Sequence, residues 1–514
     1  MRVGHLDYEH DTALLADGSP VLRLEDVTRA RAAATPDLVA VAAPSGDVTF
    51  AGLDDLASRV AQALLRDGVR PGDRVAYLGE NSADLLAVLY GAAKAGAIPT
   101  ALNTRLAEPE YVHILGDADP AVMVLGPAHV HLAGLAPGHA VTDLLGWLGD
   151  VPAEDPGHAR DPHDTALMFY SSGTTGRPKG IELTGSNLGH AMAPMTQTCG
   201  LDLGSVATAP VPFFHVAGLM LAMSSTVAGS TLLLRNPSSM AELRSFLVEE
   251  RVSHAVLVPT LLQTLLAEPG VHEADWSRLR YVIYGSSPIP RPVIEEATRV
   301  FGCDFIQSYG LTETTGGMTV LDGADHRDPD ERRLRAAGRA FRTAEIRVVD
   351  AVTLEDVAPG TRGEVLVRGP MVMKGYWRNP EATAAALTKD GWLRTGDGGS
   401  VDAEGYLYLH DRLKDMIVSG GENVFPAEVE SVMTGHPEVA QVAVVGVPSA
   451  RWGESPLAVV VRTPGAEVTG EELIAWTRER LAHYKCPTAV EYVDALPLNA
   501  SGKLLKHELR ARFS

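Results

Sequence analysis

Helical and strand-like segments alternate along the chain as far as about residue 340. Apolar residues recur at helical spacing in segments 53–65, 85–94, 240–250 and 292–301. Short β-rich runs occupy the intervals, at 73–78, 121–125, 206–211, 231–234, 255–258 and 281–284. Alternation of this kind predicts an α/β fold, in which helices cover layered, largely parallel sheets.

The pattern changes after residue 340. Strand-like runs at 344–350, 363–368 and 406–409 are joined by Gly/Pro turns and predict a small barrel-like subdomain. A compact α+β tail follows, with helices at 426–434 and 470–481 and strands at 439–447 and 457–461. We therefore expect a large N-terminal domain, residues 1–413, and a small mobile C-terminal domain, residues 414–514.

Charge and cysteine usage exclude some classes of function. The chain has 65 acidic and 44 basic residues among 514, a net charge of −21, which disfavours a broad nucleic-acid-binding face. Its 3 cysteines are widely separated, and the first residues lack the apolar core of a signal peptide. The apolar stretch 211–234 contains a histidine and predicts a buried core segment, not a membrane span. A cytoplasmic protein is expected, either a monomer or a homodimer.

A run of hydroxyl residues and glycine, YSSGTTGRPKG at 170–180, follows a strand-like segment. Gly173 and Gly176 permit backbone conformations in which several amides face one anion, and Lys179 adds a positive charge. Pro178 excludes a Walker A loop, where glycine precedes the lysine. The alternative is a surface loop; the order of the residues favours a phosphate-binding loop.

This run resembles the phosphate-binding signature of the adenylate-forming superfamily, which includes acyl-CoA synthetases, aryl-CoA ligases, luciferases and peptide-synthetase adenylation domains. Further motifs follow in the family's order along nearly the whole chain, and the resemblance is closest to fatty-acid or aryl-acid CoA ligases. It implies that ATP is bound by Ser171, Ser172, Gly173, Thr174, Thr175, Gly176 and Lys179. Thr174 would also lie at the metal.

Two motifs resemble the family's adenine-binding region, YGSSP at 284–288 and QSYGLTE at 307–313. The resemblance implies ATP contacts from Ser286, Gln307, Ser308, Tyr309 and Thr312. In that reading the ring of Tyr309 stacks on adenine and Thr312 reaches the α-phosphate. Glu313 would hold Mg²⁺, which prefers carboxylate oxygen. Taken alone, Tyr309 also fits a core position and Glu313 a first-turn carboxylate.

The remaining motifs lie in the last quarter of the chain. By the same resemblance, Asp397 in TGD and Arg412 in DRLKD contact the ribose, and Lys414 is the hinge of the C-terminal domain. Gly420 and Gly421 line the tunnel for CoA, since adjacent glycines admit a thin ligand closely. Lys503 is the adenylation lysine. Without the resemblance, these runs fit a solvated face, a turn and a surface lysine.

The acyl pocket is implied around His215, in the run PFFHVAG. A lone histidine in an apolar run is usually a core residue, but the resemblance places His215 at the carboxylate end of the pocket. The other expected lining residues are Phe214, Val216, Gly285, Gly316 and Met318, which suit an apolar aliphatic or aromatic acid. Two positions depart from the family pattern: Gly185 replaces a common histidine, and Gly398 replaces an aliphatic residue.

The resulting prediction is an AMP-forming carboxylic acid–CoA ligase that uses ATP, Mg²⁺ and CoA. A small carboxylic acid is adenylated with release of pyrophosphate, and a thiol then displaces AMP. Transfer to a carrier protein or to a nitrogen nucleophile is an alternative second step. A nucleotide-binding sensor and a generic ATPase are alternatives of other classes.

Overall fold

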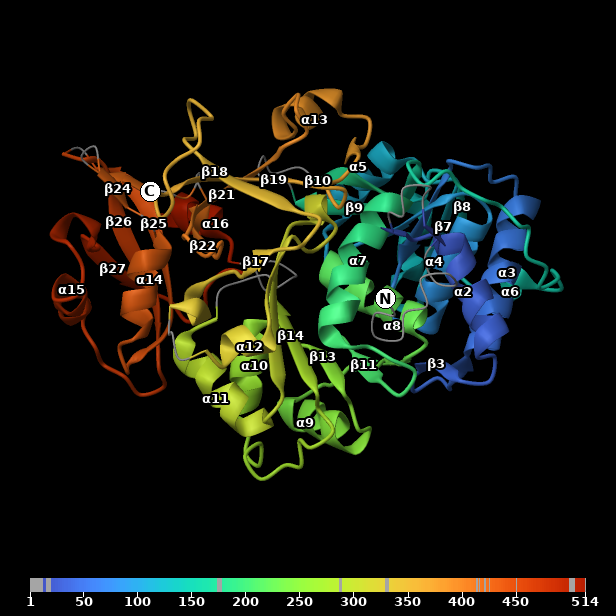
Figure 1. Ribbon diagram of the computed structural model, residues 1–514, viewed down its shortest axis with the longest axis horizontal. Coiled ribbons are helices and arrows are strands. Elements are labelled where there is room, and N and C mark those ends of the chain that lie inside the picture. The colour runs from blue at the N-terminus through green and yellow to red at the C-terminus, as the bar shows by residue number, and fades with distance from the viewer. Residues whose placement is uncertain are drawn as a thin grey trace. The chain divides into compact units, whose positions relative to one another are not determined.

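The computed structural model describes residues 13–14, 20–172, 178–285, 289–328, 332–412, 415, 417–419, 422–424, 426–449, 451–498 and 504–513. The chain forms two compact units (Figure 1). The first unit comprises residues 1–334, 338–345 and 367–393, and the second comprises 335–337, 346–366 and 394–514.

The first unit contains a seven-stranded sheet in the order β20-β10-β9-β6-β5-β7-β8. Its strands are β5 (Arg74–Leu78), β6 (Ile98–Ala101), β7 (Val122–Leu125), β8 (His139–Val141), β9 (Thr165–Ser172), β10 (Pro178–Thr184) and β20 (Gly375–Tyr376). The strands from β8 to β9 are parallel, whereas β10 pairs antiparallel with both β9 and β20.

A nine-stranded sheet in the same unit has the order β17-β16-β15-β14-β13-β11-β12-β3-β4. Its strands are β3 (Val39–Ala42), β4 (Val48–Thr49), β11 (Val206–Thr208), β12 (Thr231–Leu233), β13 (His254–Val256), β14 (Tyr281–Gly285), β15 (Asp304–Tyr309), β16 (Thr319–Leu321) and β17 (Arg339–Ala340). Pairing is parallel from β3 to β15 and antiparallel beyond, which confirms the predicted largely parallel sheets.

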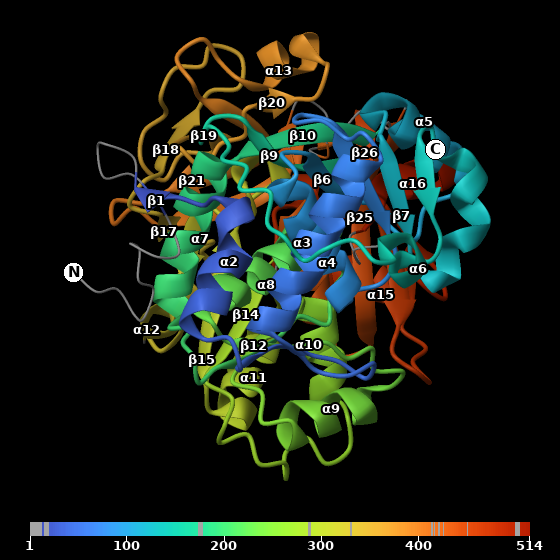
Figure 2. The ribbon, with the colours of Figure 1, turned by 90° about the vertical axis from the view of Figure 1, so that its right-hand side faces the viewer.

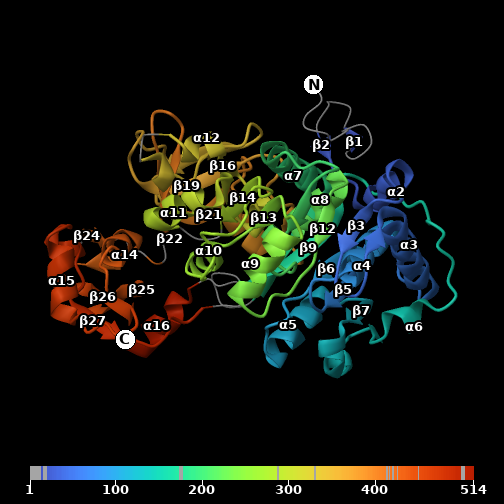
Figure 3. The same cartoon turned by 90° about the horizontal axis from the view of Figure 1, so that it is seen from below.

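Helices cover both sheets. Those between the sheets are α2 (Leu24–Ala34), α4 (Ala83–Lys94), α7 (Gly185–Cys199) and α8 (Val216–Ala228) (Figure 3). Helix α4 packs on β5 and β6, α8 packs on β11 to β13, and α2 contacts both helices. Because α4 and α8 are enclosed, their side chains are buried nearly all round. Helix α3 (Phe50–Arg66) lies beside α2 and α4, as Figure 2 shows.

The outer faces are covered by further amphipathic helices. Helices α9 (Met240–Glu249), α10 (Pro259–Leu266) and α11 (Arg291–Phe301) share one apolar cluster with β14 and β15. Helix α5 (Glu108–Ala118) packs through Tyr111 and Ile114 on β5 and β7. The apolar stretch 211–234 forms α8 and β12, within the core. Among the described residues, no helix combines the length and apolarity needed to span a bilayer.

The start of α7 explains one departure from the family pattern. Thr184 caps the helix by accepting a hydrogen bond from the Asn187 amide, and Leu22 donates its amide to the Gly185 carbonyl at 3.0 Å. A Cβ added at Gly185 would lie 2.7 Å from the Leu22 carbonyl oxygen. A histidine here would displace the segment that carries Leu22, so glycine is required by this close approach.

The second unit holds the bulk of a four-stranded sheet, β18-β19-β21-β22, and the α+β tail. The four strands are β18 (Glu345–Val349), β19 (Gly363–Arg368), β21 (Leu393–Val401) and β22 (Leu407–Arg412). The tail contains β23 (Ile417–Ser419), β24 (Glu422–Val424), α14 (Pro426–Thr434), β25 (Val439–Ser449), β26 (Gly453–Arg462), α15 (Gly470–Arg478), β27 (Ala489–Tyr492) and α16 (Lys506–Phe513). Helices α14 and α15 cover one face of its sheet and α16 covers the other, as predicted for an α+β tail.

A buried charge network joins three helices of the first unit. Lys94 on α4 is 0% exposed and donates to Asp54 at 2.7 Å, to Ser58 at 3.2 Å and to Asp155. Arg29 on α2 also donates to Asp155, at 2.9 and 3.0 Å. Asp155 follows α6 (Leu144–Leu148) in a Pro/Gly-rich stretch, around residues 135–163, whose composition is typical of a surface connection.

This network makes stability sensitive to acid. Burial alone would raise the pKa of Asp155, but the hydrogen bonds from Arg29 and Lys94 lower it to about 2 from 3.8. A depressed carboxyl pKa stabilises the folded state above the unfolded pKa. We therefore expect this contribution to be complete above pH 3.8 and lost as the pH falls towards about 2.

We predict that Lys94→Met lowers the free energy of unfolding by about 3 kcal/mol, because it removes a buried cation and leaves Asp54 without its ion pair and Asp155 with Arg29 alone. Urea unfolding followed by fluorescence measures the change. Lys389→Met, at an exposed lysine of the same unit, is the control and should change stability by less than about 0.5 kcal/mol. Equal stability of the two variants would contradict a stabilising role for the network.

Candidate active site

The predicted phosphate loop lies between two paired strands. Strands β9 and β10 form an antiparallel pair in which Ser171 is opposite Lys179 and Ser172 is opposite Pro178. The connecting residues 173–177, which include Gly173, Thr174, Thr175 and Gly176, lie outside the described residues. The pairing brings the first serine and the lysine of the motif face to face at the end of the seven-stranded sheet.

The Lys179 ammonium lies over an aromatic ring that the sequence motifs had not indicated. Its Nζ is 5.1 Å from the ring centroid of Tyr376, a distance suited to a cation–π contact. Tyr376 reaches this position because β20 pairs with β10, with Tyr376 opposite Ile181. The GYW run at 375–377 was visible in the sequence, but only strand pairing places it next to Lys179.

The same tyrosine holds the predicted metal carboxylate. Glu313 lies in a short 3₁₀ turn, η2 (Thr312–Thr314), and its Oε1 accepts a hydrogen bond from the Tyr376 hydroxyl at 2.9 Å. Its main-chain carbonyl accepts from the Met373 amide at 2.8 Å. Lys179 and Glu313, 134 residues apart in the sequence, therefore contact the same phenol, Lys179 at the ring face and Glu313 at the hydroxyl.

The donor chemistry at Glu313 fits a hard cation. Oε1 is oriented by Tyr376, while Oε2 makes no hydrogen bond to any residue that the structure describes. A partly buried carboxylate with one oriented oxygen suits Mg²⁺, which favours oxygen ligands and accompanies nucleotide phosphates. The other predicted metal residue, Thr174, is outside the described part of the chain.

The predicted adenine-binding residues lie at the carboxyl ends of two parallel strands. Pairing of β14 with β15 places Tyr284 beside Gln307 and Gly285 beside Ser308. A Cβ added at Gly285 would lie 2.4 Å from the Ser308 carbonyl, so glycine allows the two strand ends to approach. Carboxyl ends of parallel strands are the usual ligand-binding edge of an α/β sheet.

Tyr309 is partly buried at the end of β15, and Thr312 begins the 3₁₀ turn that carries Glu313. Ser286 lies outside the described residues. The predicted base-stacking residue and the metal carboxylate are thus separated by one tight turn. Only glycine fits at position 310 of that turn, since a Cβ there would lie 2.6 Å from the Gly317 backbone.

His215 occupies the N-cap position of α8 without a side-chain capping hydrogen bond, and it follows a loop that Asn81 holds in place. The Asn81 amide donates to the Val211 carbonyl at 2.9 Å, and its Oδ1 accepts from the Phe213 amide at 2.8 Å. His215 Nε2 is buried and has no hydrogen-bond partner among the described residues. Burial, with the nearby positive charge of Arg105, lowers the pKa of His215 to about 4. The ring is therefore neutral at pH 7, with a nitrogen available to a ligand.

The predicted acyl-pocket residues partly converge. Gly316 has φ +93°, and a Cβ added there would lie 3.1 Å from Cγ2 of Val216. The Phe214 ring lies 4.6 Å from that of His215. The side chains of Phe214 and Met318 are 6% and 0% exposed, so both residues are packed within the protein interior. Val216 and Gly316 approach each other from α8 and from the turn after η2.

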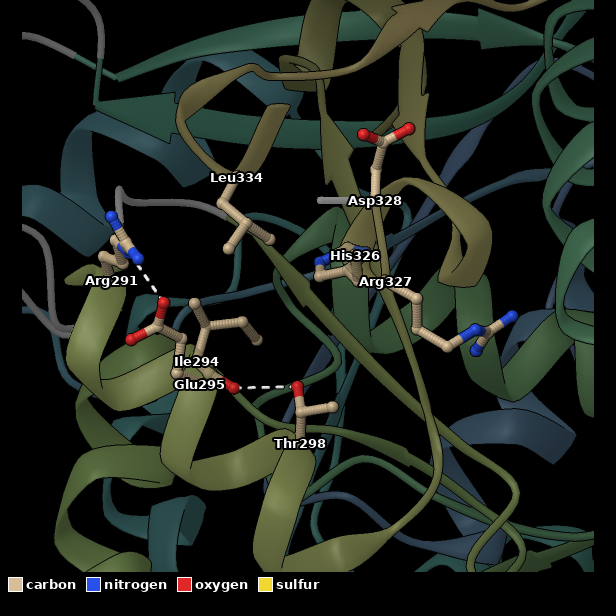
Figure 4. Close-up of a pocket in the computed structure, with 8 residues that line it drawn as sticks. All are labelled: Arg291, Ile294, Glu295, Thr298, His326, Arg327, Asp328 and Leu334. Carbon is tan, nitrogen blue, oxygen red and sulfur yellow. Dashed lines mark hydrogen bonds and ion pairs between the residues drawn. The ribbon is translucent and has the colours of Figure 1, made fainter. Parts of the chain in front are cut away.

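A separate cavity of about 340 Å³ lies beside α11 (Figure 4). It is lined by Arg291, Ile294, Glu295, Thr298, His326, Arg327, Asp328 and Leu334. Arg291 donates to Glu295 at 2.6 Å across its rim. The described residues of the predicted site are absent from this lining. His326, from α12 (Gly323–His326), is the buried titratable residue of this lining, beside the buried Ile294.

The second unit pairs the two predicted ribose residues. Asp397 on β21 is directly opposite Arg412 on β22, and the register shifts between Asp397 and Gly399. Gly398, the other departure from the family pattern, occupies this irregularity. Asp397 is 8% exposed, and its amide donates to the Thr395 hydroxyl at 3.1 Å.

Four predicted residues, Lys414, Gly420, Gly421 and Lys503, lie outside the described residues. Asp415, the described residue next to the predicted hinge Lys414, accepts a hydrogen bond from Arg510 at 2.5 Å. This ion pair joins Asp415 to α16 within the second unit.

Comparison with known proteins matches both parts of the chain. The model of the AMP-binding enzyme family matches residues 28–377, and that of the AMP-binding enzyme C-terminal domain matches residues 428–503. A feruloyl-CoA synthase from Amycolatopsis sp is 41% identical over 487 residues, covering 94% of this chain and 97% of its own. The fatty acid–[acyl-carrier-protein] ligase ScoC from Streptomyces coeruleorubidus is 37% identical, covering 93% and 94%.

Solved structures are similar over the same extent. ATP-bound MatB from Rhodopseudomonas palustris has a TM-score of 0.88 and 29% identity, covering 95% of this chain and 99% of its own. The amide bond synthetase McbA from Marinactinospora thermotolerans has a TM-score of 0.86 and 30% identity, covering 96% and 100%. The chain therefore belongs to the AMP-binding enzyme family and is an enzyme of the adenylate-forming superfamily.

Proposed function

We propose that this enzyme is an ATP-dependent carboxylic acid–CoA ligase. The observation that carries the proposal is the meeting of Lys179 and Glu313 on Tyr376. One group is a cation beside the hydroxyl-rich loop, and the other is a carboxylate suited to Mg²⁺. These two groups come from distant segments and contact the same tyrosine, which supports binding of a nucleoside triphosphate with its metal ion.

In the first step, a carboxylate oxygen of the acid attacks the α-phosphorus, and the bond to pyrophosphate breaks. Ser171 would donate a hydrogen bond to a phosphate oxygen, Lys179 would neutralise phosphate charge, and Thr312 would contact the α-phosphate. Mg²⁺, when bound, shields charge on the phosphate oxygens. Lys503, from the C-terminal domain of residues 414–514, would stabilise the charge that develops during attack.

The acid would enter beside His215 with its carboxylate towards the neutral imidazole. A neutral ring can donate one hydrogen bond to the carboxylate without forming an ion pair that would weaken its nucleophilicity. Val216 and Gly316 would face the apolar body of the acid. The 41% identity to a feruloyl-CoA synthase supports an aromatic acid. An apolar aliphatic acid also suits a pocket lined by Val216 and Gly316.

In the second step, the thiol of CoA attacks the carbonyl of the acyl-adenylate, and AMP leaves with the former carboxylate oxygen. Rotation of the C-terminal domain about Lys414 would withdraw Lys503 and bring Gly420 and Gly421 to the thiol. Asp397 and Arg412, opposite each other in the sheet, would contact the ribose throughout.

Two other acceptors share the first step. The similarity to ScoC supports transfer to a carrier-protein thiol, and the similarity to McbA supports a nitrogen nucleophile. Each alternative predicts acid-dependent AMP that does not increase with CoA. The acceptor is therefore decided by what accelerates AMP release, not by whether AMP forms.

The proposed function predicts AMP release from MgATP that depends on an acid and increases strongly with CoA. A panel of aliphatic, aromatic and cinnamic acids, each with and without CoA, measures this by chromatography of nucleotides and thioesters. AMP that depends on the acid but not on CoA would point to the carrier-protein or nitrogen alternatives. Release of ADP, or binding without products, would contradict adenylation.

Lys503→Ala should slow adenylation by about 10²–10³-fold, because it removes a charge that acts on the transition state of the first step. Thioester formation from supplied acyl-adenylate and CoA should be largely spared. Arg512→Ala, which removes an exposed cation of the same tail, is the control. An equal loss in both half-reactions would contradict the assigned role of Lys503.

Tyr376→Phe should weaken binding of MgATP by about 3–10-fold, since it deletes the hydrogen bond to Glu313 and keeps the ring over Lys179. Tyr376→Leu removes both contacts and should weaken binding further. Calorimetric titration without acid, in Mg²⁺ and in EDTA, isolates the metal-dependent part. Tyr111→Phe is the control, because that hydroxyl donates to the Asn103 carbonyl, a group outside the predicted site. Wild-type affinity in Tyr376→Phe would contradict the bridging role.

A further inference from the structure

A hydrogen-bonded row of side chains lies on the face of the nine-stranded sheet that α11 covers. The Tyr284 hydroxyl is 2.9 Å from Nε2 of His326 and 3.4 Å from Oε1 of Gln307. Nδ1 of His326 is 2.7 Å from the main-chain oxygen of Asp322. Tyr284 is 2% exposed, and His326 is 8% exposed on the cavity wall in Figure 4. The row therefore runs from a main-chain carbonyl to a predicted nucleotide-binding residue.

The carbonyl of Asp322 decides where the protons lie. A carbonyl oxygen only accepts, so Nδ1 of His326 carries hydrogen. In the neutral ring, Nε2 is then an acceptor and takes the single hydroxyl hydrogen of Tyr284. Burial lowers the pKa of His326 and outweighs the opposing effects of the Asp322 carbonyl and the carboxylates of Asp325, Asp322 and Asp304. The neutral arrangement is the one present at pH 7.

This arrangement determines which end of the Gln307 amide faces Tyr284. Once its hydrogen points to His326, the Tyr284 oxygen can only accept. An amide nitrogen satisfies that oxygen, whereas an amide oxygen repels it. A half-turn of the amide exchanges Nε2 with Oε1 at the 3.4 Å position and directs Oε1 away from Tyr284. The neutral His326 therefore favours the Gln307 orientation whose oxygen is outward.

We propose that Tyr284 and His326 are positioning residues that hold the Gln307 oxygen towards the nucleobase and so select adenine over a 6-oxo purine. The proposal rests on the proposed function, in which the base stacks on Tyr309. Gln307 and Tyr309 are two residues apart in β15 and face the same side, so the edge of a stacked base lies within reach of the amide. The adenine 6-amino group donates to Oε1, whereas a 6-oxo group would meet a second acceptor.

Tyr284→Phe keeps the buried ring and removes the hydroxyl, which frees the amide to turn. We expect the ratio of kcat/KM for ATP to that for ITP to fall by about tenfold or more, chiefly because ITP becomes a better substrate. Calorimetric titration with AMP and IMP, without acid, should show the same loss of preference. Tyr281→Phe, the same substitution at the other end of β14, is the control and should keep the wild-type ratio.

A rescue separates orientation from simple structural damage. Gln307→Glu presents an acceptor oxygen in either orientation, so Tyr284→Phe/Gln307→Glu should regain the preference for ATP over ITP. A Tyr284→Phe variant that keeps the wild-type ratio would overturn the positioning role of Tyr284 and His326. A double variant that does not regain the preference would overturn it as well. Neither result would contradict the AMP-forming activity of the proposed function. A wild-type enzyme that binds neither AMP nor IMP and releases no AMP would overturn the proposed function, and with it the positioning role of Tyr284 and His326.

Discussion

The pairing of β20 with β10 is the contact on which the candidate site depends. It places Tyr376 against Lys179 on one side and Glu313 on the other, although these residues come from three distant segments. The Met373 amide, which binds the Glu313 carbonyl, fixes the same segment a second time. A two-residue strand would be weak alone, but here side-chain and main-chain contacts to the 3₁₀ turn reinforce it. Lys179 and Glu313, the cation and the carboxylate proposed for phosphate and metal, are thereby held in place by contacts within the fold.

Burial also sets the protonation of the groups around the site. His215 and His326 are both neutral at pH 7, because burial lowers the pKa of each ring. At His215 the positive charge of Arg105 lowers the pKa further, whereas at His326 burial outweighs the opposing effect of the nearby carboxylates. A neutral imidazole has one donor and one acceptor nitrogen, and its partners determine which is which. At His215 the buried Nε2 faces no described partner and is available to a ligand, whereas at His326 both nitrogens are bonded within the fold.

Much of this fold could be predicted from the sequence because its signal is local. Helical and strand periodicities located α3, α4, α9 and α11, and strands β5, β7, β11, β12, β13 and β14 of the two large sheets. Contacts between distant segments were not predictable in this way. Asp155 lies in a segment that resembled a surface connection, yet it pairs with the buried Lys94. Gly185 departs from the family pattern, and the sequence gives no reason for it, because the Leu22 carbonyl that leaves no room for a side chain comes from a distant segment. Tyr376 and the Tyr284–His326 row were missed because strand register and helix packing, not spacing in the sequence, bring them together.

Oxygen transfer from the acid to AMP tests the central claim most directly. If the carboxylate attacks the α-phosphorus and a thiol then attacks the carbonyl, an accepted acid labelled with oxygen-18 in its carboxylate must leave one labelled oxygen in the AMP. Mass spectrometry of the AMP formed in a CoA-dependent reaction detects it. We predict labelled AMP together with a thioester that retains the other carboxylate oxygen. Unlabelled AMP, with both labelled oxygens still in the acid, would contradict an acyl-adenylate and would assign AMP formation to hydrolysis of ATP by water.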